Sequence, residues 1–415
     1  TTVTGVAGVG YFVNTSGGVV TANLPAGTAG DVIAFADYAG TFQTSNLTIS
    51  PNGSEKIGGL NIDVTLNTEG QSVTLVFVDS TQGWVTTADS TENVVGNAFI
   101  CASVSGACNT LTTAPDCANT KIATFTGPGS FTVTSAAVCA TNNVVSYMVI
   151  AGGAGGVGSY GGGGGAGGFR EYKSPVTPYT ASPLDGNPGG TAVTVTAAAF
   201  PITVGAGGFG SHTSCSPARG GNGNNSIFST ITSTGGGGGG SGTNPPTVPV
   251  SPGAPGGSGG GAGGLGPGTR PGGTGNTPPV SPSQGNNGGD ATAPGAGYSS
   301  AGGGGAGTTG TANPNPGSPS VGTAGGNGVT TSISASPVAY AGGGGGGAWQ
   351  NTGGAGGTGG GGAGGPSTAN PTFAQNGTTN LGGGGGGGRA GVGPSPDCGG
   401  ANGGSGIVII RYKFQ

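Results

Sequence analysis

Glycine dominates the chain beyond residue 150 and constrains its fold more than any other feature. Of the 106 glycines, 89 lie in the last 265 positions, many of them in unbroken runs. Long runs include residues 235–240, 342–347, 359–362 and 382–388. A collagen triple helix needs glycine at every third position, because only glycine fits its crowded axis. These runs break that period, so the sequence does not predict collagen.

A flexible linker is the second interpretation of such a composition, since glycine loses more backbone entropy on ordering than any other residue. Three features favour an ordered domain instead. The runs recur between distinct inserts rich in Pro, Asn, Thr and Ser, and the chain closes with an apolar β-type segment at 406–412. Aromatic residues lie at the edges of the runs, namely Tyr160, Phe169, Tyr340 and Trp349.

Polyglycine can also adopt an ordered form. The polyproline-II helix has three residues per turn and rises about 3.1 Å per residue. It makes no internal hydrogen bonds, so its N–H and C=O groups must find partners on neighbouring helices. Without Cβ atoms such helices pack side by side, helped by weak Cα–H···O contacts. We therefore predict a domain of packed polyglycine-II helices.

Residues 1–95 predict a small β-sandwich-like module. The segment at 72–79 is β-branched and apolar, as a core strand should be, and a turn at 80–83 leads to the next strand. A module of this size buries a modest core and is often helped by oligomerisation. Strands are expected at 10–14, 19–23, 31–36, 47–50, 62–66, 72–79 and 83–87.

The rest of the chain predicts a connector and one further unit. Residues 96–121 are rich in Cys and Thr and are expected to connect the two domains. In residues 122–415, strands are expected at 122–134 (two, around Gly-Pro-Gly), 144–150, 192–204 and 407–412. These strands lead into and out of the glycine runs, so a small β layer should cap the polyglycine bundle. No amphipathic segment with a helical period is present, so almost no α-helix is expected.

Six cysteines permit disulfides, and they are Cys101, Cys108, Cys117, Cys139, Cys215 and Cys398. The first four would form two local bridges, and the last two a long-range one. Free thiols are the alternative if the protein stays in a reducing compartment. The chain has no CxxC pair and a single histidine, so no metal site is expected.

The charge of the chain is low and slightly negative. Charged residues make up 5% of the chain, with a net charge of −4. Such a chain lacks the cluster of basic residues that nucleic-acid binding requires. It also lacks an apolar run of about 18 residues, so no membrane insertion is expected.

Sequence patterns typical of catalytic sites are weak in this chain. The segment Gly205-Ala-Gly-Gly-Phe-Gly matches part of a dinucleotide-binding loop, but no helix follows it. A nucleophilic triad needs a base, and His212 stands alone. The glycine region holds only four acids for paired-carboxylate chemistry, which are Glu171, Asp185, Asp290 and Asp397. We expect neither an enzyme nor a cofactor.

The inserts between the runs are the expected contact surfaces, since loops on a rigid scaffold often carry function. Aromatic rings in them would stack on sugar rings of a surface glycan. The candidates for receptor or glycan contact are Tyr179, Phe209, His212, Tyr298, Trp349 and Phe373. The alternative for each is that it caps the bundle and supplies its hydrophobic mass.

Several segments carry a resemblance to a known family. The segments SYMVIAGGAGG, GGGGGAGGF, ITVGAGG, GNGNNSIFSTI and GGSGIVIIRY resemble the glycine-rich domain common in tail proteins of tailed phages. This resemblance covers about residues 122–415. The N-terminal segments GYFVNTSGG, NLPAG and GDVIAFADYAGTF look like a module of phage tail-fibre and other virion proteins. The resemblance implies layered polyglycine helices with variable tip loops, as in fibre-tip adhesins.

The resemblance implies a structural virion protein, namely a tail-fibre or tail-tip adhesin on the particle surface. Its partners would be further copies of itself (a trimer), other virion proteins through the N-terminal domain, and a host-surface glycan or outer-membrane protein. A capsid-decorating or extracellular filament protein without a receptor role is the alternative. An ice-binding protein would need a regular Thr or Ala array, which the irregular inserts do not favour.

Overall fold

The computed structural model describes residues 1–90, 99–211, 219–242, 251–264, 268–293, 300–313, 321–348, 352–366, 373–389 and 399–415. The chain divides into two compact units, Thr1–Gly96 and Asn97–Gln415, called here the first unit and the glycine unit. Within the described residues the only helical element is a single 3₁₀ turn, Ala140–Asn143. The all-β prediction with almost no helix is confirmed.

The first unit consists of two four-stranded sheets. One has the order β1 (Thr2–Thr4), β3 (Val20–Asn23), β5 (Leu47–Ser50) and β6 (Val64–Leu66). The other has the order β2 (Gly10–Val13), β4 (Val32–Asp37), β7 (Ser72–Asp79) and β8 (Gly83–Ser90). Alternation along β7 buries Val73, Leu75 and Phe77, which pack with Trp84 and Phe35 in the core between the sheets.

A larger sandwich forms one end of the glycine unit. Its six-stranded sheet contains β10 (Thr110–Ala114), β11 (Cys117–Phe125), β23 (Ile407–Lys413), β13 (Val144–Ile150) and β14 (Phe169–Tyr172) in that order, with β15 (Val193–Thr194) paired to β13. Its five-stranded sheet has the order β18 (Ile231–Ser233), β17 (Ser226–Phe228), β16 (Ala199–Thr203), β12 (Gly129–Ser135) and β9 (Cys101–Ser105). We call this sandwich the basal end.

The structure corrects two sequence-based boundaries. Residues 101–121, expected to be a connector, form β9, β10 and the start of β11 within the sandwich. Their Thr-rich composition suits half-exposed strands, and this period-2 pattern was hidden by the cysteines. Residues 192–204, expected to be one strand, form β15 and β16, which belong to different sheets because one pairs with β13 and the other with β12.

The central strands β13 and β23 are buried on both faces. Val145, Tyr147 and Val149 face the core between the two sheets. Met148 and Ile150 face a second core on the other side, which the hairpin of β21 (Val329–Thr331) and β22 (Val338–Tyr340) covers. Burial on both faces explains why both segments are almost continuously apolar.

The glycine runs bond to one another with a period of three residues. The N–H groups of Ala151 and Ala154 donate to the carbonyls of Gly168 and Gly165, three residues apart on a neighbouring run. The N–H groups at the other two positions of each turn donate to carbonyl groups on two further runs. The acceptors are Asn224 and Gly221 on one run, and Gly404 and Ala401 on the other. This is the bonding pattern of a helix with three residues per turn whose three rows of N–H groups face three different neighbours.

The carbonyl groups of the same run, residues 151–158, accept from another three runs. Those donors include Gly236 with Gly239, Gly208 with Ser211, and Gly385 with Gly388. The run at 342–348 is bonded on all sides in the same way, with donors and acceptors on other runs. The bundle thus satisfies between helices the backbone groups that a polyglycine helix leaves open.

Glycine is required in the runs because the backbones approach too closely for a side chain. A Cβ atom on Gly152 would lie 2.0 Å from the carbonyl oxygen of Ala206, and one on Gly163 would lie 2.1 Å from that of Gly344. Alanine occurs only where the packing leaves room, as at Ala262 and Ala301, which contact each other in a small buried cluster.

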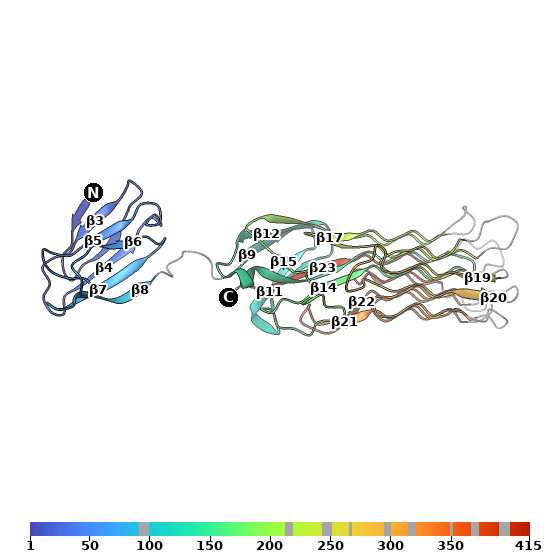
Figure 1. Cartoon of the computed structure of the whole chain (residues 1–415). Coiled ribbons are helices and arrows are strands. Elements are labelled where there is room, and N and C mark those ends of the chain that lie inside the picture. Colours follow the sequence, from blue (N-terminus) through green and yellow to red (C-terminus); the bar gives the residue numbers. More distant parts are fainter. Residues whose placement is uncertain are drawn as a thin grey trace. The chain divides into compact units, whose positions relative to one another are not determined.

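The runs extend from the sandwich to a second end of the glycine unit, called here the distal end (Figure 1). The hairpin of β19 (Gly268–Arg270) and β20 (Ala291–Ala293) lies there. The C-terminal strand β23 lies at the basal end, so the runs connect a β-sheet base to a distal end built mainly of turns and run termini (Figure 1).

The packing predicts a strong effect of one added methyl group. In Gly345→Ala the new Cβ atom would lie 2.0 Å from the carbonyl oxygen of Gly354. We expect the unfolding free energy of the glycine unit to fall by about 3 kcal/mol, near the upper end of overpacking costs, as measured by chemical denaturation of the full chain.

Gly127→Ala is the matched control, since its Cβ atom would lie 3.7 Å from the nearest atom, the carbonyl oxygen of Ala107. Its effect should stay within about 0.5 kcal/mol. Equal effects of the two substitutions would contradict the packing argument.

Candidate functional site

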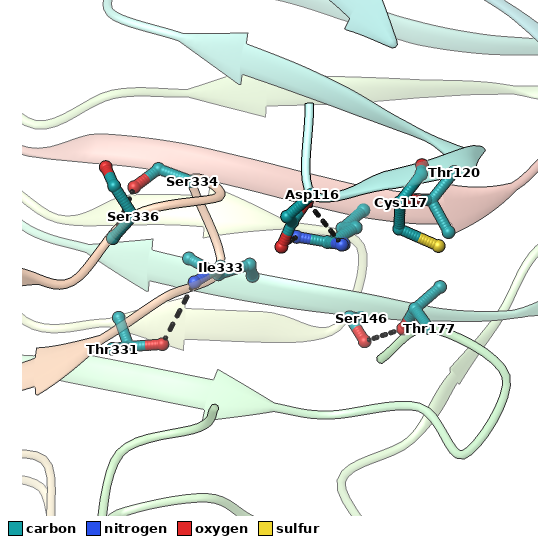
Figure 2. A network of polar contacts seen from close by, with 10 residues as sticks. Asp116, Cys117, Thr120, Ser146, Thr177, Thr331, Ile333, Ser334 and Ser336 are labelled. Carbon is teal, nitrogen blue, oxygen red and sulfur yellow. Dashed lines mark hydrogen bonds and ion pairs between the residues drawn. The ribbon is translucent and has the colours of Figure 1, made fainter. Parts of the chain in front are cut away.

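Polar side chains gather in two places in the glycine unit, at the basal end and at the distal end. At the basal end the fully buried Arg411 of β23 makes two hydrogen bonds to the carboxylate of Asp116, with N···O distances of 2.9 and 3.1 Å. Asp116 belongs to the turn between β10 and β11, and Figure 2 shows it beside Cys117 and Thr120. The guanidinium also lies 5.5 Å from the ring centroid of Tyr179.

Hydroxyl groups extend this basal network along β13 and the segment after β14. The Ser146 hydroxyl bonds to that of Thr177 (Figure 2) and accepts from the N–H of Ser174 at 2.7 Å. Ser146 is the β-sheet partner of Arg411, so it lies on the same face of the sheet. The network thus fastens the loop at 174–177 over the polar end of an otherwise apolar face.

Glu171 of β14 is buried in the same region. Its carboxylate accepts hydrogen bonds from the N–H of Ser182 and from the hydroxyl of Thr331. Burial raises the pKa of this carboxyl above its usual value, while the bonds from Ser182 and Thr331 act in the opposite direction. Thr331 also accepts from the N–H of Ile333 (Figure 2). The acid therefore connects β14 to the covering hairpin.

The basal network has the chemistry of a structural clamp. Most of its donors and acceptors are bonded to each other, with the Nε atom of Arg411 as an exception, and both Arg411 and Glu171 are shielded from solvent. Throughout the described part of the chain, no three His, Cys, Asp or Glu side chains gather into a group that could hold a metal ion. We therefore place the candidate functional site at the distal end.

The distal end is built around the turn at Ser159 and Tyr160, two residues with positive φ angles of 46° and 58°. This turn reverses the chain between the runs 151–158 and 161–168. The N–H of Ser159 donates to the carbonyl of Arg389, and the N–H of Gly264 donates to that of Tyr160. The other described residues at which runs end here include Ser211, Arg219, Ser241, Ser251, Ser300, Ala348 and Thr352.

The aromatic candidates occupy different environments. Phe209 and Phe373 have exposed fractions of 80% and 49%, and both belong to segments that run to the distal end. Tyr179 instead packs at the basal end with Lys173 and Arg411 against its ring, and burial raises the pKa of its hydroxyl. For Tyr179 the capping alternative therefore holds, because the loop that carries it folds over the sheet. His212, Tyr298 and Trp349 lie outside the described residues.

The cysteine prediction is wrong for the four described residues. Cys101, Cys108, Cys117 and Cys139 carry thiols and form no disulfide. Cys108 lies between β9 and β10, whereas Cys101 lies at the far end of β9, and Cys117 begins β11, beyond the far end of β10. A five-residue strand spans about 16 Å, and disulfide-bonded Cα atoms lie within about 7 Å. Cys215 and Cys398 lie outside the described residues.

The first unit carries a second exposed feature on the outer face of the sheet β2-β4-β7-β8. Phe12 is 79% exposed, and Val32 and Val78 are also exposed. Strand alternation places only uncharged side chains on this face of β2, β4 and β7. They are Phe12, Val32, Ala34, Ala36, Ser72, Thr74, Val76 and Val78, and we call them the neutral face.

Comparison with family models finds a match over the glycine-rich part of the chain. A family model described as a glycine-rich domain matches residues 125–413, well over half of the chain. No curated protein matches the sequence. None of the described residues forms a helix long and apolar enough to cross a membrane.

The buried position of Glu171 predicts a pH effect on stability. The pKa of this carboxyl is higher in the folded than in the unfolded chain, so the folded state holds the proton more tightly. Its contribution to stability therefore decreases as the pH rises above the usual carboxyl value of 4.5. Glu171→Gln cannot ionise, and we expect the stability of this variant relative to wild type to increase over that pH range.

Urea denaturation of both proteins at a series of pH values would measure this difference. The comparison removes the contribution of other carboxyls, such as Asp37 of the first unit, whose pKa is lowered by backbone hydrogen bonds. Parallel stability curves for the two proteins would show that Glu171 has the same pKa in the folded and the unfolded chain, and would contradict the prediction.

Proposed function

This chain belongs to the glycine-rich domain family, and we propose that it is a structural virion protein of a tailed phage. In this proposal it is a tail-fibre or tail-tip adhesin at the particle surface, and its distal end attaches to the host. The proposal combines the family membership with the resemblance of the N-terminal segments to virion modules and with the geometry of the distal end.

One observation carries the proposal. Several inserts that interrupt the glycine runs join described residues at the distal end, such as Ser211 with Arg219, Ala348 with Thr352, and Arg389 with Gly399. The basal end, in contrast, holds the sandwich core and the buried clamp. A rigid bundle that gathers several of its connections at one end has the architecture of a binding surface on a scaffold.

The first unit suits a role in assembly. It carries eight acidic residues and one lysine, a net charge of −7, whereas the glycine unit has a net charge of +3. Copies of so acidic a module repel one another, and this repulsion is weakest when the surfaces in contact carry no charge. The neutral face offers such a surface, and we propose that it contacts a second copy of the chain in a homo-oligomer.

A substitution on the neutral face tests this oligomer. Phe12→Glu adds one more negative charge within the proposed contact and should shift the full chain toward the monomer in sedimentation equilibrium. Ile62→Glu is the matched control, because Ile62 is 54% exposed but lies outside the neutral face. The same oligomer size for wild type and both variants would remove the neutral face from the contact.

Immunoelectron microscopy tests the role in the virion. Antibodies raised against the purified glycine unit region should label the tips of tail appendages and should block adsorption of the phage to its host. Label over the whole head would favour the capsid-decorating alternative. Filaments formed by the purified chain, without any label on particles, would favour the extracellular filament alternative.

A further inference from the structure

We propose that the distal end recognises an anionic glycan, with Arg270 and Arg389 as the donors to its carboxylate or phosphate groups. This inference rests on the proposed role in host attachment and specifies the chemistry of the ligand. It is carried by the position of the arginines, by their lack of acidic partners and by the aromatic residues beside them.

The distal cations are all arginines and are not paired with acids among the described residues. Arg219, Arg270 and Arg389 are the three cationic residues in the long stretch between β15 and β23. The ion pair seen in the described part of the chain is the basal one between Arg411 and Asp116. Asp290, a nearby acid, uses its carboxylate to accept the N–H of Gly272.

Arg270 and Arg389 flank the turn at Ser159 and Tyr160 from two sides. The carbonyl of Arg389 accepts the N–H of Ser159. On the other side Gly264 donates to the carbonyl of Tyr160, and a guanidinium nitrogen of Arg270 donates to the carbonyl of Gly263 at 3.2 Å. One chain of contacts therefore runs from Arg270 through the turn to Arg389.

Both guanidinium groups are partly withdrawn from water. Arg270 is half-buried, and burial lowers the pKa of its guanidinium below the usual value. Arg389 is also half-buried, and its Nε atom is buried without a hydrogen-bond partner. A partly desolvated cation without a counter-charge gains more from an anion than a fully solvated one does.

Aromatic side chains lie next to these cations. Tyr160 belongs to the turn itself and is partly exposed. Ala374 and Arg389 both lie against Gly365, which brings the exposed Phe373 to the side of the distal end that carries Arg389. An aromatic ring offers an apolar face to a sugar ring, and the planar guanidinium fork matches a carboxylate or phosphate. Together these groups fit an acidic or phosphorylated sugar better than a neutral one.

Binding of the full chain to immobilised polysaccharides tests the inference. The probes are polygalacturonate, which carries carboxylates, a phosphorylated lipopolysaccharide core, and neutral dextran. We expect binding to at least one anionic probe, none to dextran, and a decrease in affinity between 0.1 and 1 M salt as the Debye length falls from about 10 to about 3 Å. The two anionic probes distinguish carboxylate from phosphate recognition.

Single substitutions identify the donors. Arg270→Gln and Arg389→Gln should each weaken binding about tenfold, the loss expected for one charge-assisted contact. Arg219→Gln, at an exposed position, provides a further distal variant if either of the others fails to fold. Lys121→Gln removes the same charge at the basal end and should leave binding unchanged.

Two results would overturn the inference. One is equal binding to dextran and to the anionic probes, and the other is an equal effect of the distal substitutions and Lys121→Gln. Competition with the phage for host cells keeps this inference separate from the proposed function. If wild type and the distal variants compete equally, the attachment role stands and the arginine site fails. If the chain binds the anionic probes but never competes, the site stands and the attachment role fails.

Discussion

The glycine unit depends on hydrogen bonds between backbones that no side chain separates. In a helix or a sheet, backbone bonding is local or planar, and side chains occupy the remaining directions. Here the N–H and C=O groups of each run form hydrogen bonds in several directions around its axis, so that a run such as 151–158 is surrounded by other runs. Such a bundle gains little from hydrophobic burial, because glycine brings almost no apolar surface, and its cohesion comes from backbone bonds and close packing.

The sandwich supplies what the bundle lacks. Its two faces of β13 and β23 bury Tyr147, Met148 and Val149 together with the residues of the covering hairpin. Apolar side chains that would clash inside the bundle are thus concentrated at one end. The ion pair between the buried Arg411 and the partly exposed Asp116 then joins the last strand to the turn between β10 and β11.

Much of the fold was predictable because its signals are local. The β-branched alternation at 72–79 and the apolar segments at 144–150 and 407–412 predict strands, and the structure has β7, β13 and β23 there. Short strands such as β17 and β21 were missed, since three residues carry too little pattern and depend on their partners. Which run lies beside which was also beyond prediction, because identical glycines encode no pairing preference. The distal arginines were passed over for the same reason, since the turn that brings Arg270 and Arg389 together joins distant segments.

The strand order of the six-stranded sheet has a consequence for the synthesis of the chain. Strand β23 lies between β11 and β13, although more than 250 residues separate it from either of them. The ribosome therefore releases β11 and β13 with a vacant position between them, and all the glycine runs emerge before that position is filled. The first unit is free to fold early, as N-terminal domains do during synthesis. The glycine unit can complete its central sheet only after residue 413 has left the ribosome. A chain whose synthesis stops before that point would therefore have an unfilled, apolar position at the centre of the sheet.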